Sequence, residues 1–99
     1  MTMNNAEDSA YKGEDTDHGR WVTDQVAVAI ANDGEFLDGE RVAFRARDFA
    51  ESGDLAALAA FVTNRIKTGT DFRALRAELS ANDYDRINWC TVASELTTV

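Results

Sequence analysis

Carboxylates are the most abundant reactive side chains in this sequence, and most of them lie near its start. The first forty residues hold ten acids against Lys12 and Arg20, a net charge of −8, whereas the remaining residues hold eight acids and eight bases. A segment of this sign repels phosphate, but it is attracted to a basic surface, including one that normally holds nucleic acid. The alternative is that the acids only keep the chain in solution.

The acids near Gly34 and Gly39 raise the question of a calcium loop. An EF-hand loop needs oxygen ligands at positions 1, 3, 5 and 12 and a glycine at position 6. With Gly34 at position 6, Ala29 and Ala31 fall at positions 1 and 3, and with Gly39 there Phe36 falls at position 3. Because neither register supplies the ligands, we predict a solvated acidic loop and no metal.

The chain has one histidine, His18, and one cysteine, Cys90, far apart in the sequence. Zinc needs several such ligands, so no zinc site is expected. A Cys–His nucleophile pair is formally available, but Cys90 follows Trp89 in an amphipathic pattern typical of an ordinary helical thiol. His18 is expected to contact solvent.

Two pairs of carboxylates could in principle act as an acid and a base. They are Asp15 with Asp17 and Asp83 with Asp85, and all four lie in polar, loop-like settings where ordinary pKa values are expected. The chain also has no glycine-rich phosphate motif and no nucleophile elbow. We therefore predict a protein that is not an enzyme and needs no cofactor.

A helix-turn-helix over residues 70–97 is a further possibility, because basic side chains gather near its start. Recognition helices usually present bases and polar groups to the groove, whereas the last expected helix presents one acid, Glu95, and no base. A DNA-associated regulator is therefore kept only as an alternative, with Arg73 and Arg76 expected to pair with Glu78 or other nearby acids. The bases concerned are Arg65, Lys67, Arg73 and Arg76.

The segment 20–33 fits two kinds of element. Val26, Val28 and Ile30 alternate as in a half-buried strand, whereas Val22, Val26 and Ile30 also share one face of a helix. The patterns that follow are helical with short connections, so a helix ending at the Asn-Asp-Gly sequence is favoured. Asparagine or glycine readily takes the left-handed conformation that ends a helix.

The rest of the chain predicts an all-α fold, a compact single-domain bundle of four or five helices over residues 18–99. The acidic residues 1–17 lack apolar periodicity and are expected to be a disordered tail. Further helices are expected from Glu40 to Glu51 capped by Asp38, from Ser52 or Asp54 to Gly69, after a cap at Thr70, and, beyond a break at Asn82-Asp83, after a cap at Asn88. Trp89, Val92 and Leu96 are expected to pack on Val22, Val26 and Ile30, with Phe49, Leu58, Phe61 and Val62 filling the middle.

Cellular location follows from what the sequence lacks. The N-terminus shows no basic and apolar secretory pattern, and no run of about 18 apolar residues suggests a membrane span. A single cysteine fits a reducing compartment. We expect a cytoplasmic protein that does not enter a membrane.

Two segments resemble motifs of a set of small, uncharacterised phage and mobile-element proteins. Residues 20–33, RWVTDQVAVAIAND, are similar to a motif of the form NYETWNVALWLDND, although Asp24 and Ala29 stand where those proteins have tryptophans. Residues 87–96, INWCTVASEL, resemble a second motif of the form VNWxEIAxxL. The matching positions are Thr23, Val26, Ala27, Ile30, Asn32 and Asp33 in the first motif and Asn88, Trp89, Val92, Ala93 and Leu96 in the second.

The resemblance implies a small all-α protein in which the first and last helices pack together. It carries no established activity, but the gene neighbourhoods of such proteins imply an accessory role in phage or plasmid biology, which includes inhibitors of host defence. Our hypothesis is therefore a non-enzymatic phage or mobile-element protein, such as an anti-CRISPR or anti-restriction inhibitor, that occludes a basic nucleic-acid-binding site on a protein partner.

The acids expected to bind that partner are those held in shape around the end of the first helix. A disordered tail loses more entropy on binding, so its charges count for less. A small enzyme subunit or stability factor is a further alternative, and the oligomeric state is left open. The predicted partner-binding residues are Asp24, Asp33, Glu35, Asp38 and Glu40.

Overall fold

The segment that fits both a strand and a helix lies in a helix. In the computed structural model, which describes residues 11–97, helix α2 spans Asp17–Ala31. Thr16 caps it, because its Oγ1 accepts a hydrogen bond of 3.0 Å from the backbone N–H of Gly19. The helix ends before Asn32, as predicted, but Asn32 has a φ of −100° and not the left-handed conformation.

A small hairpin follows α2 where the sequence pattern predicts the start of a helix. Strands β1 (Phe36–Leu37) and β2 (Glu40–Arg41) pair antiparallel, and Asp38 and Gly39 between them have positive φ values of 55° and 83°. Positive φ at both central residues is what a two-residue hairpin turn of the primed type requires. Asp38 is therefore a turn residue and not a helix cap, and helix α3 begins only at Val42.

The remaining helices follow the predicted pattern with shifted boundaries. Helix α3 spans Val42–Ser52, and α4 spans Leu55–Thr68 behind an Asp54 cap that accepts from Ala57 N–H at 3.1 Å. The predicted Thr70 cap is wrong, since Thr70 begins a 3₁₀ turn. The later elements are the 3₁₀ helix η1 (Thr70–Phe72), α5 (Arg73–Glu78), the 3₁₀ helix η2 (Ala81–Arg86) in place of the predicted break, and α6 (Trp89–Thr97).

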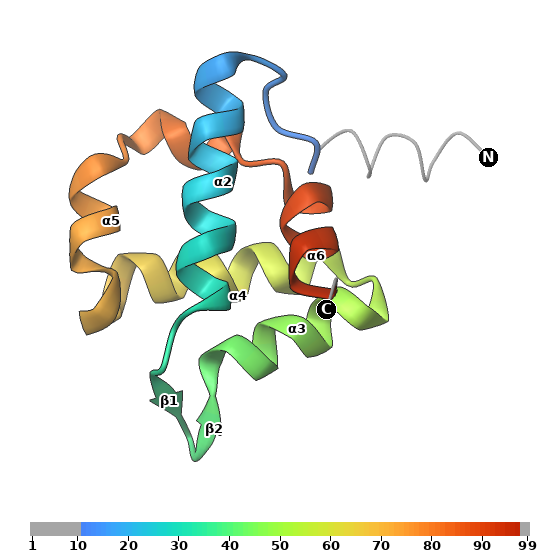
Figure 1. The fold of residues 1–99 in the computed structure, drawn as a ribbon, viewed down its shortest axis with the longest axis vertical. Coiled ribbons are helices and arrows are strands. Elements are labelled where there is room, and N and C mark those ends of the chain that lie inside the picture. The colour runs from blue at the N-terminus through green and yellow to red at the C-terminus, as the bar shows by residue number, and fades with distance from the viewer. Residues whose placement is uncertain (1–10, 98–99) are drawn as a thin grey trace.

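The core forms where α2, α3, α4 and α6 meet. Helix α2 packs against α6 and α3, and α3 also packs against α4 and α6 (Figure 1). The predicted packing of the first helix on the last is thus confirmed, and Trp89 is only 5% exposed. The largest fully buried side chains are Val22, Val26, Ile30, Val42, Leu58, Val62, Ile66, Ile87 and Val92, while Phe49 and Phe61 pack against them partly buried.

The described part of the predicted tail is attached to the domain. Tyr11 packs on the core, and its carbonyl accepts a hydrogen bond of 2.7 Å from the N–H of Trp89. Glu14 N–H donates to the carbonyl of Arg86 at 3.2 Å. The prediction of a disordered tail is therefore wrong for residues 11–17, and residues 1–10 lie outside the described part of the chain.

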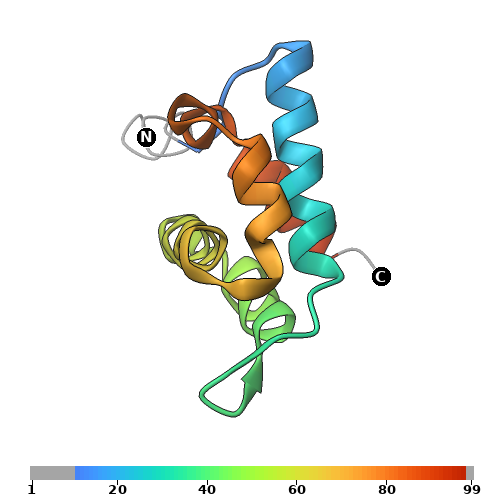
Figure 2. The same ribbon diagram turned by 90° about the vertical axis from the view of Figure 1, so that its left-hand side faces the viewer.

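The fold class predicted from the sequence is confirmed: the protein is a compact, mostly helical single unit, with the hairpin as an addition. The hairpin lies at one end of the molecule, beyond the helices, in both views of the ribbon (Figures 1 and 2). Between residues 11 and 97, no helix is long and apolar enough to cross a membrane.

Candidate functional site

The five predicted partner-binding acids do not form one surface. Asp38 and Glu40 are exposed on the hairpin, at its turn and on β2. Asp24 is exposed on α2, but it lies seven residues before the end of that helix, about 10 Å along its axis. Asp33 is only 5% exposed, and Glu35 is partly buried, so both differ from the prediction of a displayed acidic group.

Asp33 and Glu35 instead belong to a cluster of three acids, of which Asp33 is buried, Glu35 is partly buried and Asp71 is exposed. The Nη2 atom of Arg65, at the end of α4, contacts Glu35 Oε1 at 2.7 Å. Asp33 Oδ1 accepts a hydrogen bond of 3.1 Å from the N–H of Glu35, while Asp33 Oδ2 is buried and has no hydrogen-bond partner among residues 11–97. Asp71 from η1 completes the cluster, and one carboxylate oxygen of each acid lies within 4.8 Å of the others.

Burial and like charge act together on Asp33. Loss of solvent raises the pKa of Asp33 above its ordinary value, and the carboxylates of Asp71 and Glu35 add to that rise. The N–H of Glu35 acts in the opposite direction but does not outweigh burial. Two of the acids predicted to bind a partner thus belong to this cluster, at the connections between α2, the hairpin and η1.

The hairpin and the start of α3 expose two large aromatic side chains. Phe36 is 63% exposed and Phe44 is 51% exposed. Phe36 pairs across the hairpin with Arg41, and cross-strand partners project to the same face. The guanidinium carbon of Arg41 lies 5.2 Å from the centre of the Phe44 ring, so the two phenylalanines flank one arginine.

Acids lie beside one of these aromatic side chains, Phe44. A shallow groove of about 350 Å³ runs along α3 beside Phe44, with Glu40, Arg47, Asp48 and Glu51 as its other lining residues. Arg47 Nε lies 3.7 Å from Glu51 Oε2. Glu40 and Asp48 have no ion pair among the described residues. We call Phe36, Asp38, Glu40, Phe44 and Asp48 the hairpin surface.

The basic side chains near α4 and α5 are largely engaged inside the molecule. Arg76 does not pair with Glu78 as predicted; its Nη1 donates to the carbonyl oxygens of Ile66 and Gly69 at 2.5 and 3.1 Å. These contacts satisfy carbonyls near the end of α4. Since Arg65 is held by Glu35, this side of the molecule does not present the row of free bases that a nucleic-acid interface needs.

A buried polar centre that the sequence pattern did not predict lies around Asp83. Asp83 is 4% exposed, and its Oδ2 accepts from the N–H of Ser80 at 2.9 Å. Its Oδ1 lies 2.9 Å from His18 Nε2 and 2.7 Å from Arg86 Nη1. These donors, the Ser80 N–H foremost, lower the pKa of Asp83 to about 2. The prediction of an ordinary loop aspartate is therefore wrong.

The sequence did contain a signal for this centre. Ser80 and Asp83 form a reciprocal capping box, in which a serine is followed three residues later by an acceptor side chain. His18 is exposed, as predicted, but its ring also has partners: Nε2 lies 2.9 Å from Asp83 Oδ1, and the ring stacks on Trp21 with the centres 5.6 Å apart. Cys90 is partly buried in α6 and is not His18's partner.

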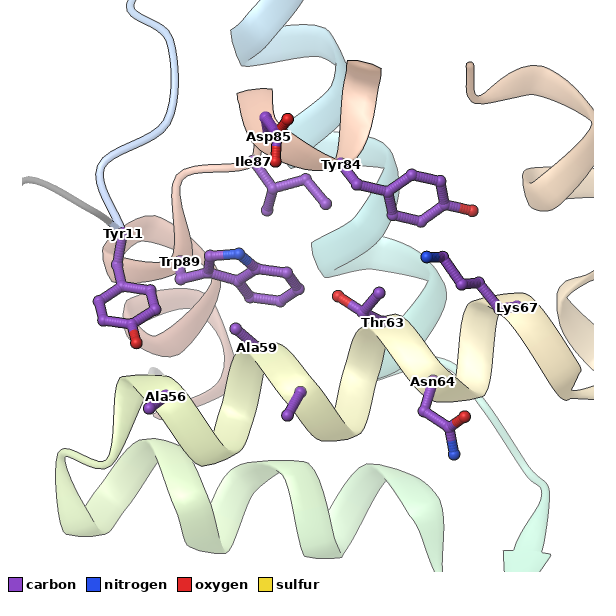
Figure 3. A pocket seen from close by; sticks show the side chains of 11 residues that line it. Tyr11, Ala56, Ala59, Thr63, Asn64, Lys67, Tyr84, Asp85, Ile87 and Trp89 are labelled. Carbon is purple, nitrogen blue, oxygen red and sulfur yellow. The ribbon is translucent and has the colours of Figure 1, made fainter. Parts of the chain in front are cut away.

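A larger groove opens between α4, η2 and α6 (Figure 3). Its volume is about 730 Å³, and Trp89, Tyr84 and Tyr11 form its aromatic wall opposite Ala56 and Ala59. Burial raises the pKa of Tyr84, so this phenol keeps its proton at neutral pH and can donate a hydrogen bond. Among the described residues that line the groove, none is a nucleophile activated by a neighbouring base.

Comparisons with protein-family models, with curated proteins and with solved structures give no match for this chain.

Proposed function

We propose that this protein acts through protein–protein interaction, with the hairpin surface contacting a partner that combines an apolar pocket with a basic rim. The observation that supports this proposal is the exposure of two aromatic side chains, Phe36 on the hairpin and Phe44 at the start of α3, together with the exposed Asp38 at the hairpin turn and Glu40 beside Phe44. Aromatic side chains surrounded by polar ones are the usual anatomy of an interface centre and its rim.

The acids define the sign of the charge expected on the partner's surface. Because the first forty residues carry a net charge of −8, a basic surface is favoured electrostatically over an acidic or nucleic-acid one. A positively charged groove with aromatic side chains on which bases stack is typical of proteins that bind single-stranded nucleic acid. The proposed mechanism is occlusion of such a site, as in an inhibitor of a defence complex, in line with the phage and mobile-element proteins that the sequence resembles. We expect the protein to act in the cytoplasm, without catalysis.

The alternative of a DNA-associated regulator receives less support. Of the four bases on which it depends, Arg65 and Arg76 make intramolecular contacts. Lys67 Nζ lies 4.9 Å from the centre of the Tyr84 ring. Lys67 and Arg73 are exposed, and two exposed bases make few phosphate contacts.

The test is capture of the partner from the cells in which the gene resides, with wild-type and variant proteins compared at equal loading. Asp38→Lys combined with Glu40→Lys should abolish capture of a basic nucleic-acid-binding protein, and Phe36→Ser should weaken it at least tenfold. Asp85→Lys with Glu95→Lys makes the same charge change away from the hairpin and should leave capture intact.

Two further measurements connect capture with the proposed mechanism. The partner's own nucleic acid should compete with this protein for binding. Affinity should also fall as salt is raised, since the Debye length shortens from about 10 Å at 0.1 M to about 3 Å at 1 M. A captured partner that the hairpin variants still bind, with no competition from nucleic acid, would contradict the proposal.

A further inference from the structure

The carboxylates of Asp33, Glu35 and Asp71 come from different parts of the chain and meet in one place. Asp33 and Glu35 lie in the connection between α2 and β1, and Asp71 lies in η1 between α4 and α5. One oxygen of each lies within 4.8 Å of the others. Three negative groups so close repel one another unless something positive lies between them.

The protein's own cations neutralise this cluster only in part. Arg65 contacts Glu35 at 2.7 Å. Arg41 Nη2 donates at 3.3 Å to the backbone carbonyl of Asp33 and not to its carboxylate. The side chains of Asp33 and Asp71 have no ion pair with a base among residues 11–97.

Asp33 supplies a second and separate observation. The residue is 5% exposed, and its Oδ2 has no hydrogen-bond partner in the described part of the chain. A buried carboxylate oxygen without a donor is energetically costly, and native proteins rarely keep one without an ion, a water or a functional use. The carboxylate that carries this oxygen belongs to the cluster, since one of its oxygens lies within 4.8 Å of an oxygen of each of the other two acids.

We propose that Asp33, Glu35 and Asp71 bind a hard divalent cation of the Ca²⁺ or Mg²⁺ class. Such cations take oxygen ligands at about 2.3–2.6 Å for Ca²⁺ and 2.0–2.1 Å for Mg²⁺, so oxygens on opposite sides of the ion lie about 4–5 Å apart. The three carboxylate oxygens lie within 4.8 Å of one another, a separation no wider than a Ca²⁺ coordination sphere. Water completes the coordination, which sets an affinity on the order of 10⁻⁴–10⁻³ M.

The cation would join the end of α2, the base of the hairpin and η1. Glu35 also accepts a backbone hydrogen bond of 2.9 Å from the N–H of Val42, the first residue of α3. Binding would thus hold the hairpin in one orientation on the helices. This inference does not rest on the proposed partner, since it concerns the isolated protein.

The experiment measures cation binding by the full chain after treatment with a chelator. Calorimetry and thermal unfolding at pH 7 are followed as Ca²⁺ and Mg²⁺ are added separately, which distinguishes the two ions. Wild type should bind one ion per chain and melt at a higher temperature. Asp71→Asn should weaken binding at least tenfold and yet fold at least as stably without the ion, because one repulsive charge is removed. Asp85→Asn, an exposed acid elsewhere, should bind as wild type does.

Paramagnetic Mn²⁺ locates the ion independently. In NMR spectra it should broaden the amide signals of Gly34, Glu35 and Asp71 at lower concentration than those of Asp24 or Asp38. No binding up to about ten times the expected dissociation constant would overturn the proposal. Equal binding by wild type and Asp71→Asn, or first broadening at the hairpin turn, would overturn it as well. The proposal would also be overturned if the three acids shared a proton. In that case the melting temperature would rise at lower pH and would not respond to cations.

Discussion

Asp33 follows Asn32, and Asp83 follows Asn82. Both aspartates are almost fully buried, yet their surroundings are opposite. Asp83 is surrounded by donors, from the Ser80 N–H to the His18 ring and the Arg86 guanidinium, and its pKa falls. Asp33 has one donor and two neighbouring carboxylates, and its pKa rises.

The difference shows what burial means for an acid. A buried carboxylate that receives several hydrogen bonds stabilises the fold, and in this protein Asp83 joins η2 to the start of α2. A buried carboxylate with an unpartnered oxygen destabilises the fold unless a ligand compensates. The contacts of Asp83 within the fold explain why it is buried, whereas the unpartnered oxygen of Asp33 is the basis of the cation site proposed above.

Removal of the Asp83 side chain should destabilise the protein more than any substitution at Asp33. Asp83→Ala leaves the Ser80 N–H without its acceptor and leaves Arg86 with its contact to Glu14, so the free energy of unfolding should fall by about 2–3 kcal/mol. Urea unfolding followed by circular dichroism measures it. Asp85→Ala, two residues on and exposed, should change the value by less than about 0.5 kcal/mol. Equal effects would show that the Asp83 contacts contribute little.

Two glycines allow the same comparison at the backbone. Gly13 has a φ of 67°, and a Cβ there would lie 2.4 Å from the carbonyl oxygen of Arg86, beside the Asp83 centre. Gly34, between Asp33 and Glu35, has nothing within 4 Å of such a Cβ. Gly13→Ala should therefore destabilise by about 2 kcal/mol, and Gly34→Ala should be neutral or slightly stabilising. Thermal melts of the two variants measure these changes in stability. Equal losses of stability would contradict the tight contact at Gly13.

The sequence predicted the longer helices well because each has a periodic apolar face, although two of the predicted caps, Asp38 and Thr70, are wrong. The hairpin was missed because Asp38 can cap a helix or occupy a turn, and only the positive φ of Asp38 and Gly39 distinguishes the two. The Asp33 cluster was beyond sequence reasoning for another reason. Asp71 lies 38 positions after Asp33, and no local pattern indicates that a 3₁₀ turn will bring their side chains together.

One substitution made at both aspartates should act in opposite directions. Asp83→Asn loses the charge that Arg86 and His18 bind, so it should destabilise. Asp33→Asn keeps an oxygen for the Glu35 N–H and adds an N–H that can donate to Asp71. In chelator it should therefore stabilise by about 1 kcal/mol, the net worth of one hydrogen bond. Urea midpoints at pH 7 measure both, and a destabilised Asp33→Asn would contradict the account of Asp33 as an uncompensated charge.

The smallest effect expected is in the pH dependence of the Asp83 centre. An aspartate has a pKa of about 3.9 in an unfolded chain, and that of Asp83 in the fold is about 2. Because the folded value is the lower one, the stabilisation is fully present above about pH 4 and is lost as pH falls through about pH 2. The difference in unfolding free energy between wild type and Asp83→Asn should thus shrink as pH falls below about pH 4.

The matched control for this last measurement is Asp85→Asn, because Asp85 is exposed on the same element. Its difference from wild type should stay small over the whole range. Urea unfolding at intervals of about half a pH unit resolves both curves. If the Asp83→Asn difference stayed unchanged down to about pH 2, the contribution of Asp83 would come from its shape and neutral hydrogen bonds, and the contrast with Asp33 would no longer be one of charge.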